Sequence, residues 1–245
     1  MKVALVTGAS RGLGAEIAVQ LAQAGWKTAV NYAHDDDGAA ATVDRIETAG
    51  GTACRSRFDI TDESAVRAGM MSVASELGSI DLIVNNATGP QGAVPLPEQT
   101  WDLYQRHLDF FVKAPFLLLK EVLADWCSRK SGRIINIGSE VTKLGSPFDA
   151  HYVAAKAAMI GLTRSWATEL GPHGITVNMV SPGWTPVARH VGTPQSEYDA
   201  HVAKLPLGRM GLPGDVAGVV AFVASPAADY ITGQELCVNG GRTYS

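Results

Sequence analysis

The sequence predicts a doubly wound α/β fold, in which a parallel sheet of about seven strands has helices on both faces. Three observations indicate this. Short runs rich in β-branched residues alternate with longer segments of helical period. Most of these runs are almost continuously apolar, as in strands buried on both faces. A glycine cluster joins the first run to the first helical segment. No break in composition divides the chain, so one domain is expected over residues 1–245.

The strands are expected at the apolar runs, with one further strand before Asp59. The first helix presents Ile17, Leu21 and Ala24 on one face and ends at Gly25, since glycine tolerates the left-handed conformation there. Asp35, Asp36 and Asp37 are interpreted as a solvated turn before the second helix. The expected strands are 3–6, 28–32, 82–84, 133–137, 176–180 and 235–238, and the later helices are 39–49, 100–131 and 150–170.

Composition excludes several classes of protein. The 20 basic and 24 acidic residues are mixed along the chain, with a net charge of -4, so no basic stripe fits a nucleic acid. The apolar run at the start is too short for a signal peptide, and no later stretch approaches a membrane span. A soluble, cytoplasmic protein is expected. The three cysteines are widely separated and unclustered, which predicts reduced thiols and neither a disulfide framework nor a metal site.

The segment 183–212 differs from the rest of the chain because prolines interrupt regular structure in and around it. They are Pro182, Pro186, Pro194, Pro206 and Pro213. Such a segment either covers a substrate site or is only an irregular connection, and the sequence leaves both interpretations open.

The run from Thr7 to Gly14 lies where the first strand meets the first helix. Glycines at such a turn let backbone amides approach a pyrophosphate, which the positive end of the helix also attracts. Gly8, Gly12 and Gly14 suit these tasks. A glycine cluster alone is weak evidence, but its position strengthens the prediction of a dinucleotide site.

Tyr152 and Lys156 are four residues apart in a predicted helix, so their side chains lie on one face. A fixed ammonium favours the phenolate form of a nearby tyrosine, which makes the pair a candidate for proton transfer. Ser139 follows the predicted strand 133–137 closely and offers a hydroxyl for a substrate oxygen. A lone pair of this kind is more often an exposed tyrosine beside a solvated lysine, so the context has to decide.

The ordered motifs resemble those of the short-chain dehydrogenase/reductase family. The glycine spacing is Gly-x-x-x-Gly-x-Gly, Asn-Asn-Ala follows the fourth strand, a serine follows the fifth, and Tyr-x-x-x-Lys is on the next helix. Pro-Gly follows the sixth strand, and Thr-Gly-Gln and Val-Asn-Gly-Gly come near the end. The set spans almost the whole chain in family order. The resemblance implies a Rossmann fold that binds NAD(P) and an enzyme acting on CH-OH/C=O groups.

The resemblance also assigns roles. It implies that Tyr152 is the general acid/base, that Lys156 lowers the pKa of Tyr152 and binds the nicotinamide ribose, and that Ser139 holds the substrate oxygen. Asp59, expected to contact adenine, could instead cap a helix beginning near Asp62. The residues expected to bind the cofactor are Gly8, Ser10, Arg11, Gly12, Leu13, Gly14, Asn31, Tyr32, Asp59, Ile60, Asn86, Ala87, Tyr152, Lys156, Pro182, Gly183 and Thr185.

Two departures from the family pattern stand out. Thr88 follows Asn-Asn-Ala where the family prefers glycine. Similar proteins have an asparagine before the fifth strand that holds a water in a proton relay, whereas Phe111 or Leu108, depending on the alignment, stands there in this chain. His107 or Asp109 could replace it, although either could equally be an ordinary polar group.

The cofactor preference is predicted to be NADPH, with NADH as the alternative. The second strand ends without the acidic residue that usually binds the NAD ribose, and Arg11 lies where NADP-dependent relatives place a cation. Against this, Asp35 to Asp37 could fold back toward the ribose.

The chain looks most like the 3-oxoacyl-acyl-carrier-protein reductases, which implies reduction of a carbonyl or acyl thioester. An acyl carrier protein is then a candidate partner, and Arg129, Lys130 and Arg133 could form a basic patch for it or a solvated helix end. A homo-oligomer, dimer or homotetramer, is expected through helices that carry Trp126 and Trp166, unless these are core residues. The alternatives are an NAD-dependent alcohol or sugar dehydrogenase and a non-catalytic dinucleotide sensor or partner subunit.

Overall fold

The structure is a computed structural model that describes residues 1–89 and 92–244. Over these residues, seven strands form one sheet in which every neighbouring pair is parallel. The strand order is β3-β2-β1-β4-β5-β6-β7, so the sheet extends in opposite directions from β1. The strands are β1 (Val3–Val6), β2 (Lys27–Tyr32), β3 (Thr52–Arg57), β4 (Ile80–Asn85), β5 (Gly132–Ile137), β6 (Ile175–Pro182) and β7 (Glu235–Val238). This is the predicted doubly wound fold.

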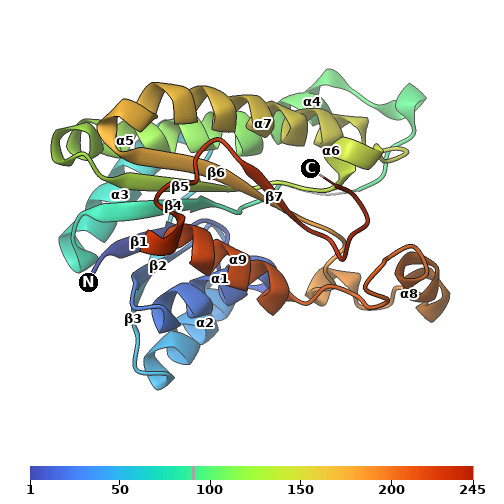
Figure 1. Ribbon diagram of the computed structural model, residues 1–245, viewed down its shortest axis with the longest axis horizontal. Coiled ribbons are helices and arrows are strands. Elements are labelled where there is room, and N and C mark those ends of the chain that lie inside the picture. The colour runs from blue at the N-terminus through green and yellow to red at the C-terminus, as the bar shows by residue number, and fades with distance from the viewer. Residues whose placement is uncertain (90–91, 245) are drawn as a thin grey trace.

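Helices cover both faces of the sheet (Figure 1). Helices α1, α2 and α9 pack on one face, while α3, α5 and α7 pack on the other, and each layer encloses its own apolar core. The helices are α1 (Gly12–Gln23), α2 (Asp36–Thr48), α3 (Glu63–Leu77), α4 (Trp101–Leu108), α5 (Ala114–Arg129), α6 (Val141–Leu144), α7 (Ala150–Leu170), α8 (Gln195–Val202) and α9 (Pro213–Ala224).

Burial follows the position of each strand. All four residues of central strand β1 are buried, whereas edge strand β3 alternates between buried and exposed residues because only one of its faces is well covered. Trp126 of α5 is fully buried, and its indole N–H donates to the carbonyl of Ile80 at 2.7 Å. Trp126 is therefore a core residue and not part of an oligomer surface, while Trp166 is partly buried against the same core.

Two local expectations need correction. The segment 100–131 is not one uninterrupted α-helix, because a π-helical turn at Asp109–Lys113 separates α4 from α5. Asp35 to Asp37 are not simply a turn. Asp35 caps α2 by accepting a hydrogen bond from the amide of Gly38, and Asp36 and Asp37 form the first helical turn, where acidic residues favour the positive helix end.

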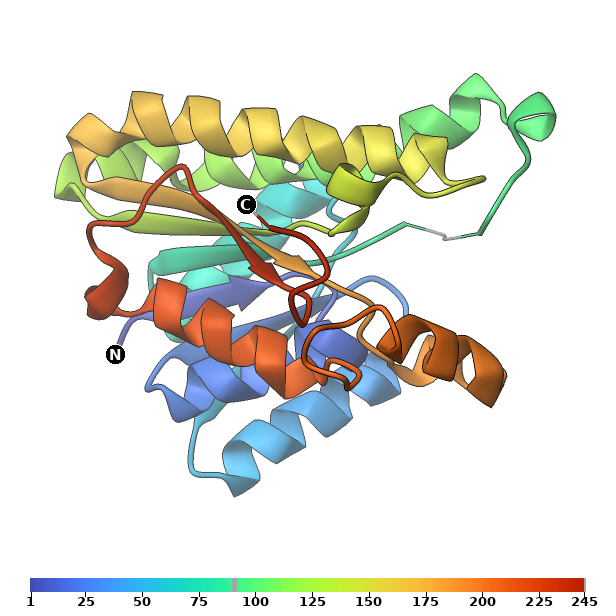
Figure 2. The same cartoon turned by 45° about the vertical axis from the view of Figure 1, so that its right-hand side comes forward.

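The carboxyl ends of the strands lead into the loops that carry the predicted site. The segment 183–212 holds helix α8 between irregular stretches, and α8 projects beyond the sheet beside the C-terminal loop (Figure 2). In open parallel sheets, ligands bind outside the carboxyl ends near the point where the strand order reverses. That point lies between β1 and β4. Among the described helices, none is long and apolar enough to cross a bilayer.

Candidate active site

The turn between β1 and α1 brings the backbone close to its neighbours. Gly8 has φ +62°, and a Cβ there would lie 2.8 Å from Cα of Ala87. A Cβ on Gly14 would lie 2.3 Å from the carbonyl oxygen of Gly8. The side chain of Arg11, the N-cap residue, makes no capping hydrogen bond in the described structure. The first amides of α1 are thus available to an anion, which fits the pyrophosphate of a dinucleotide.

Side chains directly after β1 and β4 fix this turn. The hydroxyl of Thr7 accepts hydrogen bonds from the amides of Asn86 and Ala87, at 2.9 and 3.0 Å. The side-chain amide of Asn86 donates to the carbonyls of Thr7 and Gly8, at 2.9 and 3.1 Å. Asn86 and Ala87, both predicted to bind cofactor, therefore lie against the glycine turn.

Asn31 and Tyr32, the residues predicted at the end of β2, lie beside the glycine turn. Asn31 is buried, and its side chain accepts from the amide of Gly8 and donates to the carbonyls of Ser56 and Phe58. Tyr32 is also buried, and its hydroxyl donates to Asp36. Both side chains are thus committed to protein partners.

Arg11 and Asp35 lie together beside the glycine turn. The guanidinium of Arg11, whose side chain is 78% exposed, is 3.8 Å from the carboxylate of Asp35. Of the three aspartates considered at this position, Asp35 is the one that turns back toward Arg11, because it caps α2 next to Ser10. A cation and an anion therefore lie side by side next to the glycine turn.

Asp59 and Ile60 follow β3. Ile60 is buried, and exposed Asp59 accepts hydrogen bonds from the amide and hydroxyl of Thr61, both at 2.8 Å. The helix cap is Asp62, which accepts from the amide of Ala65 at 2.8 Å. Asp59 therefore does not cap α3, and both of these hydrogen bonds are made by the same carboxylate oxygen, Oδ1.

Ser139 lies in the turn that follows β5. The amide of Gly138 donates to the carbonyl of Val180, which holds the start of this turn against β6. The Ser139 hydroxyl accepts a long hydrogen bond of 3.4 Å from the amide of Val141. The turn sets the serine at the carboxyl end of the sheet, as predicted.

A chain of buried polar side chains fixes α7 to the sheet. The amide of Asn85 donates to Asn136 at 2.8 Å, and the amide of Asn136 donates to the hydroxyl of Thr163 on α7 at 2.9 Å. These bonds cross from β4 through β5 to the helix. They set the depth and rotation of the helix that carries Tyr152 and Lys156.

Lys156 is a buried cation beside the serine turn. Its side chain is almost inaccessible, and Nζ donates to the carbonyl of Ile137, two residues before Ser139, at 2.6 Å. Nζ also lies 5.8 Å from the centroid of the Tyr152 ring. The structure therefore brings Lys156 together with Tyr152 and the Ser139 turn, as the sequence pattern predicted.

Phe111, in the π-helical turn, contacts both members of this pair. Its ring centroid is 3.8 Å from Nζ of Lys156. The Phe111 ring also meets the ring of Tyr152 edge-on, with the two centroids 5.6 Å apart. Of the two residues considered for the place of the family asparagine, Phe111 is the one whose ring meets Lys156. Asp109 does not replace that asparagine here, because its carboxylate accepts from Gln105 on the outer side of the helix.

His107 packs against the same aromatic group. Its ring lies 5.8 Å from that of Tyr152 and 4.7 Å from that of His151. Burial, with His151 and Arg106 nearby, lowers the pKa of His107 to about 4. In the described part of the chain, Nδ1 of His107 and Nδ1 of His151 are buried without a hydrogen bond. His107 is therefore a neutral ring that meets the ring of Tyr152 edge-on.

The loop after β6 joins the site to α8. Pro182 and Thr185 are buried, and the Thr185 hydroxyl donates to the carbonyl of Gly183 at 3.2 Å. Trp184 stacks on Tyr198 of α8, with the ring centroids 5.0 Å apart. The unusual tryptophan in this motif thus packs against α8, within the same segment 183–212, and Thr185 next to it is buried.

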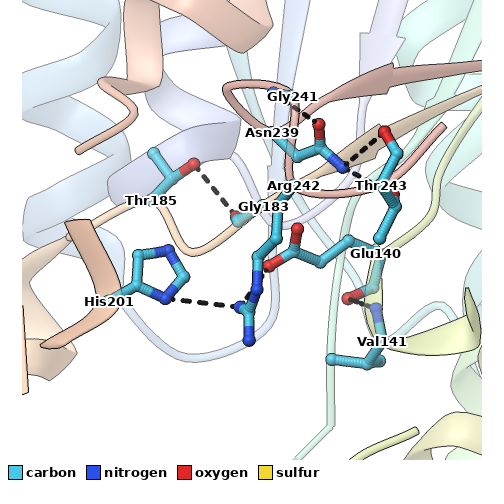
Figure 3. Close-up of polar contacts among 10 residues, drawn as sticks. Glu140, Val141, Gly183, Thr185, His201, Asn239, Gly241, Arg242 and Thr243 are labelled. Carbon is cyan, nitrogen blue, oxygen red and sulfur yellow. Dashed lines mark hydrogen bonds and ion pairs between the residues drawn. The ribbon is translucent and has the colours of Figure 1, made fainter. Parts of the chain in front are cut away.

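Sequence reasoning missed Glu140 and Arg242. Glu140 follows Ser139, is buried, and accepts a hydrogen bond from Arg242 at 2.9 Å (Figure 3). No short motif links two residues 102 positions apart. The one available signal was an acidic residue directly after the candidate serine.

The proposed basic patch lies at the wrong end of the sheet. Arg129 ends α5 and Arg133 is the second residue of β5, so both lie at the amino ends of the strands. Arg129 pairs with Asp81 and Asp125, and Arg133 pairs with Asp229. These cations are therefore structural and do not form a patch beside Ser139.

The cysteines and possible metal ligands add no second site. Cys54, Cys127 and Cys237 are free thiols, and burial, aided by Glu76, raises the pKa of Cys54 to about 12. Over the described residues, no group of three or more His, Cys, Asp or Glu side chains is arranged to hold a metal ion.

Comparison with known proteins identifies the family. A family model described as enoyl-(acyl carrier protein) reductase matches residues 8–243. The 3-oxoacyl-(acyl-carrier-protein) reductases FabG of Staphylococcus aureus and Vibrio cholerae are 41% and 39% identical, over 98% of this chain and 97% and 96% of theirs.

Solved structures agree with this relationship. The reductase LugOII, which catalyses a keto-reduction in lugdunomycin biosynthesis, matches with a TM-score of 0.91 and 34% identity, over 98% of this chain and 97% of that one. A blue fluorescent protein from a metagenomic library, solved with NADPH, matches with a TM-score of 0.88 and 38% identity, over 99% and 98%. The chain therefore belongs to the short-chain dehydrogenase/reductase family and is an NAD(P)-dependent oxidoreductase, most like the 3-oxoacyl-(acyl-carrier-protein) reductases.

Proposed function

We propose that the protein uses NADPH to reduce a ketone, of the 3-oxoacyl thioester class, to a secondary alcohol. The observation that carries this proposal is the buried ammonium of Lys156, held 2.6 Å from the carbonyl of Ile137 between Tyr152 and the Ser139 turn. A buried cation beside a tyrosine favours the phenolate that must form when the phenol gives up a proton.

In the proposed reaction, Tyr152 gives its proton to the carbonyl oxygen of the substrate. The hydroxyl of Ser139 donates a hydrogen bond to the same oxygen and stabilises the negative charge that develops there. Lys156 compensates the charge left on Tyr152. Bound NADPH supplies the hydride that reaches the carbonyl carbon. In oxidation of an alcohol, Tyr152 takes the proton instead.

The residues proposed to hold the cofactor line the carboxyl ends of β1 to β6. Gly8, Gly12 and Gly14, with the first amides of α1, receive the pyrophosphate, and Asn86 and Ala87 line the adenosine side. Arg11 offers its guanidinium to the 2′-phosphate of NADPH, and Thr185 receives the carboxamide. Asn31 and Tyr32 contribute mainly by supporting the turn.

Several further assignments belong to this proposal. The chain is taken as one domain over residues 1–245, with 183–212 covering the substrate through α8. A 3-oxoacyl group carried by an acyl carrier protein is the proposed physiological substrate, because FabG proteins are named for that activity. A cytoplasmic location stays a prediction from the sequence, which cell fractionation can test.

A homo-oligomer, dimer or tetramer, is also proposed. Large apolar side chains stay exposed on α4 and α5, among them Trp101 at 69% and Phe116 at 48%, and such a surface is typical of contacts between subunits. Light scattering that gives a monomer mass at working concentration would contradict this assignment.

The test of function is a steady-state assay of NADPH oxidation with a panel of ketones and 3-oxoacyl thioesters. We expect Tyr152→Phe to lower kcat about 100-fold or more while NADPH still binds. Tyr230→Phe, at a fully exposed tyrosine, is the control. Tight NADPH binding without turnover of any carbonyl would favour a dinucleotide sensor, and faster oxidation of alcohols with NAD would favour the dehydrogenase alternative.

A further inference from the structure

One guanidinium nitrogen joins three segments that are far apart in the sequence. Nη1 of Arg242 lies 2.9 Å from Oε1 of Glu140 and 3.3 Å from Nδ1 of His201 (Figure 3). Glu140 belongs to the turn that follows Ser139, His201 belongs to α8, and Arg242 belongs to the loop after β7. We call these three residues the Arg242 bridge.

The protonation states of the bridge agree with its geometry. Burial, with Arg242 and Lys204 nearby, lowers the pKa of His201, so its ring is neutral at pH 7. A guanidinium can only donate, so Nδ1 of His201 has to be the acceptor. Burial raises the pKa of Glu140, and the guanidinium of Arg242 beside it opposes this shift. The geometry is that of an ion pair between Glu140 and Arg242, with the neutral ring of His201 as third member.

Burial makes the bridge sensitive to the loss of one member. The side chain of Glu140 is 4% exposed, and its second oxygen, Oε2, makes no hydrogen bond within the described residues. A buried ion pair adds little net stability, but removing one partner leaves an uncompensated charge. Such a pair is better suited to fixing the relative positions of segments than to stabilising the fold as a whole.

Each end of the bridge continues into the proposed active site. The amide of Glu140 donates to the carbonyl of Pro182, and the next amide, that of Val141, donates to the hydroxyl of Ser139. On the other side, His201 meets the ring of Trp184 edge-on, with the centroids 5.1 Å apart. The bridge thus links the serine turn, the loop after β6 and helix α8.

The loop that carries Arg242 is itself held in shape. Asn239 donates to the hydroxyl of Thr243 at 2.7 Å and accepts from the amide of Gly241 at 3.2 Å. The side chain of Asn239 therefore closes the loop around Arg242. The backbone that carries the guanidinium of Arg242 is therefore held in place by hydrogen bonds within the loop.

We propose that Glu140 and Arg242 are positioning residues, which hold the Ser139 turn and helix α8 in one fixed arrangement for substrate. The inference rests on the proposed carbonyl reduction. It assigns no new group to the reacting atoms, since the bridge acts through the serine turn and through the segment that covers the substrate.

The variants are Arg242→Met, Arg242→Lys, and the double variant Glu140→Gln with Arg242→Met. Arg242→Met should lower kcat/KM for the ketone about 10- to 100-fold, as expected when a reacting group is slightly misplaced. The Kd for NADPH should change much less than kcat/KM, because the glycine turn, which holds the pyrophosphate, is untouched. Arg242→Lys should recover most of the activity, since an ammonium can also donate to both Glu140 and His201.

The controls separate positioning from a general loss of structure. The double variant leaves no lone buried charge and should fold while remaining as slow as Arg242→Met. Arg67→Met breaks an exposed ion pair with Glu121 and should keep wild-type kinetics. The proposal is overturned if Arg242→Met keeps wild-type kcat and KM, if it loses NADPH binding to the same extent as activity, or if Arg242→Lys restores nothing.

A second readout does not depend on turnover. Deuterium uptake by the amides of α8 should be faster in Arg242→Met than in the wild type, and near the wild-type rate in Arg242→Lys. If the wild type reduces no carbonyl, the proposed function fails, and deuterium uptake alone then decides whether the bridge holds α8. Unchanged uptake in Arg242→Met would refute the bridge.

Discussion

The ring of Phe111 lies against the ammonium of Lys156, with its centroid 3.8 Å from Nζ. The face of an aromatic ring attracts a cation, and this attraction is stronger when the cation is desolvated, as Lys156 is. The ring fills the side of Lys156 that faces the π-helical turn. On that side, Lys156 therefore meets an aromatic ring that can neither accept nor pass on a proton.

Replacing Phe111 by Leu should lower kcat about 10-fold, because the leucine fills space without attracting the ammonium. NADPH binding should change less than kcat. Phe111→Tyr should keep most of the activity, since it keeps the ring. Phe222→Leu is the control, because this phenylalanine is exposed on α9. Equal kcat values for Phe111→Leu and the wild type would show that the ring is only packing.

Replacing Arg11 by Ala should lower kcat/KM for NADPH about 10- to 100-fold and leave that for NADH nearly unchanged. The reason is that a hydrogen bond to a charged phosphate contributes about 1.5–3 kcal/mol. Asp35→Asn should raise the ratio of kcat/KM for NADPH to kcat/KM for NADH. It removes the carboxylate that competes for Arg11 but keeps a side-chain oxygen to cap α2. A wild-type enzyme that strongly prefers NADH would contradict both expectations.

Adding a methyl group at Gly14 should destabilise the fold and weaken cofactor binding together. In Gly14→Ala the new Cβ would lie 2.4 Å from Nδ2 of Asn86, in addition to its clash with Gly8, so the turn has to shift. We expect a loss of about 1–3 kcal/mol in the free energy of unfolding and a higher Kd for NADPH. Gly218→Ala, in α9 with its nearest neighbour 3.8 Å away, should instead be neutral or stabilising. Thermal unfolding and NADPH titration of both variants test this.

The stability of the protein should fall as the pH is lowered from about 6.5 to 4. His107 has its pKa lowered to about 4 in the folded state, against 6.5 for an ordinary histidine. Between these values the unfolded chain binds a proton that the folded protein does not, so the free energy of unfolding decreases as the pH falls. His107→Leu should flatten this dependence. Urea unfolding at several pH values measures the free energy of unfolding of the wild type and of His107→Leu. The same dependence on pH in both proteins would contradict the assignment to His107.

Much of the fold could be predicted because local patterns determine it. The glycine turn, the buried strands and the helix ending at Leu170 each have signals within a few residues. The cap of α3 was harder, because Asp59 and Asp62 are both plausible capping residues, and only the backbone geometry selects Asp62.

The parts that the sequence did not predict depend on contacts between distant segments. The π-helical turn is where Phe111 reaches Lys156, which belongs to a different helix. The partners of Arg129 and Arg133 include Asp81 and Asp229, which are far away in the chain. The link from Glu140 to Arg242 exists only after β7 has joined the sheet. None of these contacts has a periodic or short-range signal.

The residues proposed for proton transfer lie in the stretch from the end of β5 through α7, whereas α8 comes from a later part of the chain. The proposed chemistry and the proposed covering of the substrate are therefore encoded in separate stretches. Substitutions in 195–202 can alter which ketone fits without disturbing Tyr152 or Lys156, provided that residue 201 still offers an acceptor to Arg242. A new substrate range would then be obtained first by substitutions in α8 that keep the contact between residue 201 and Arg242.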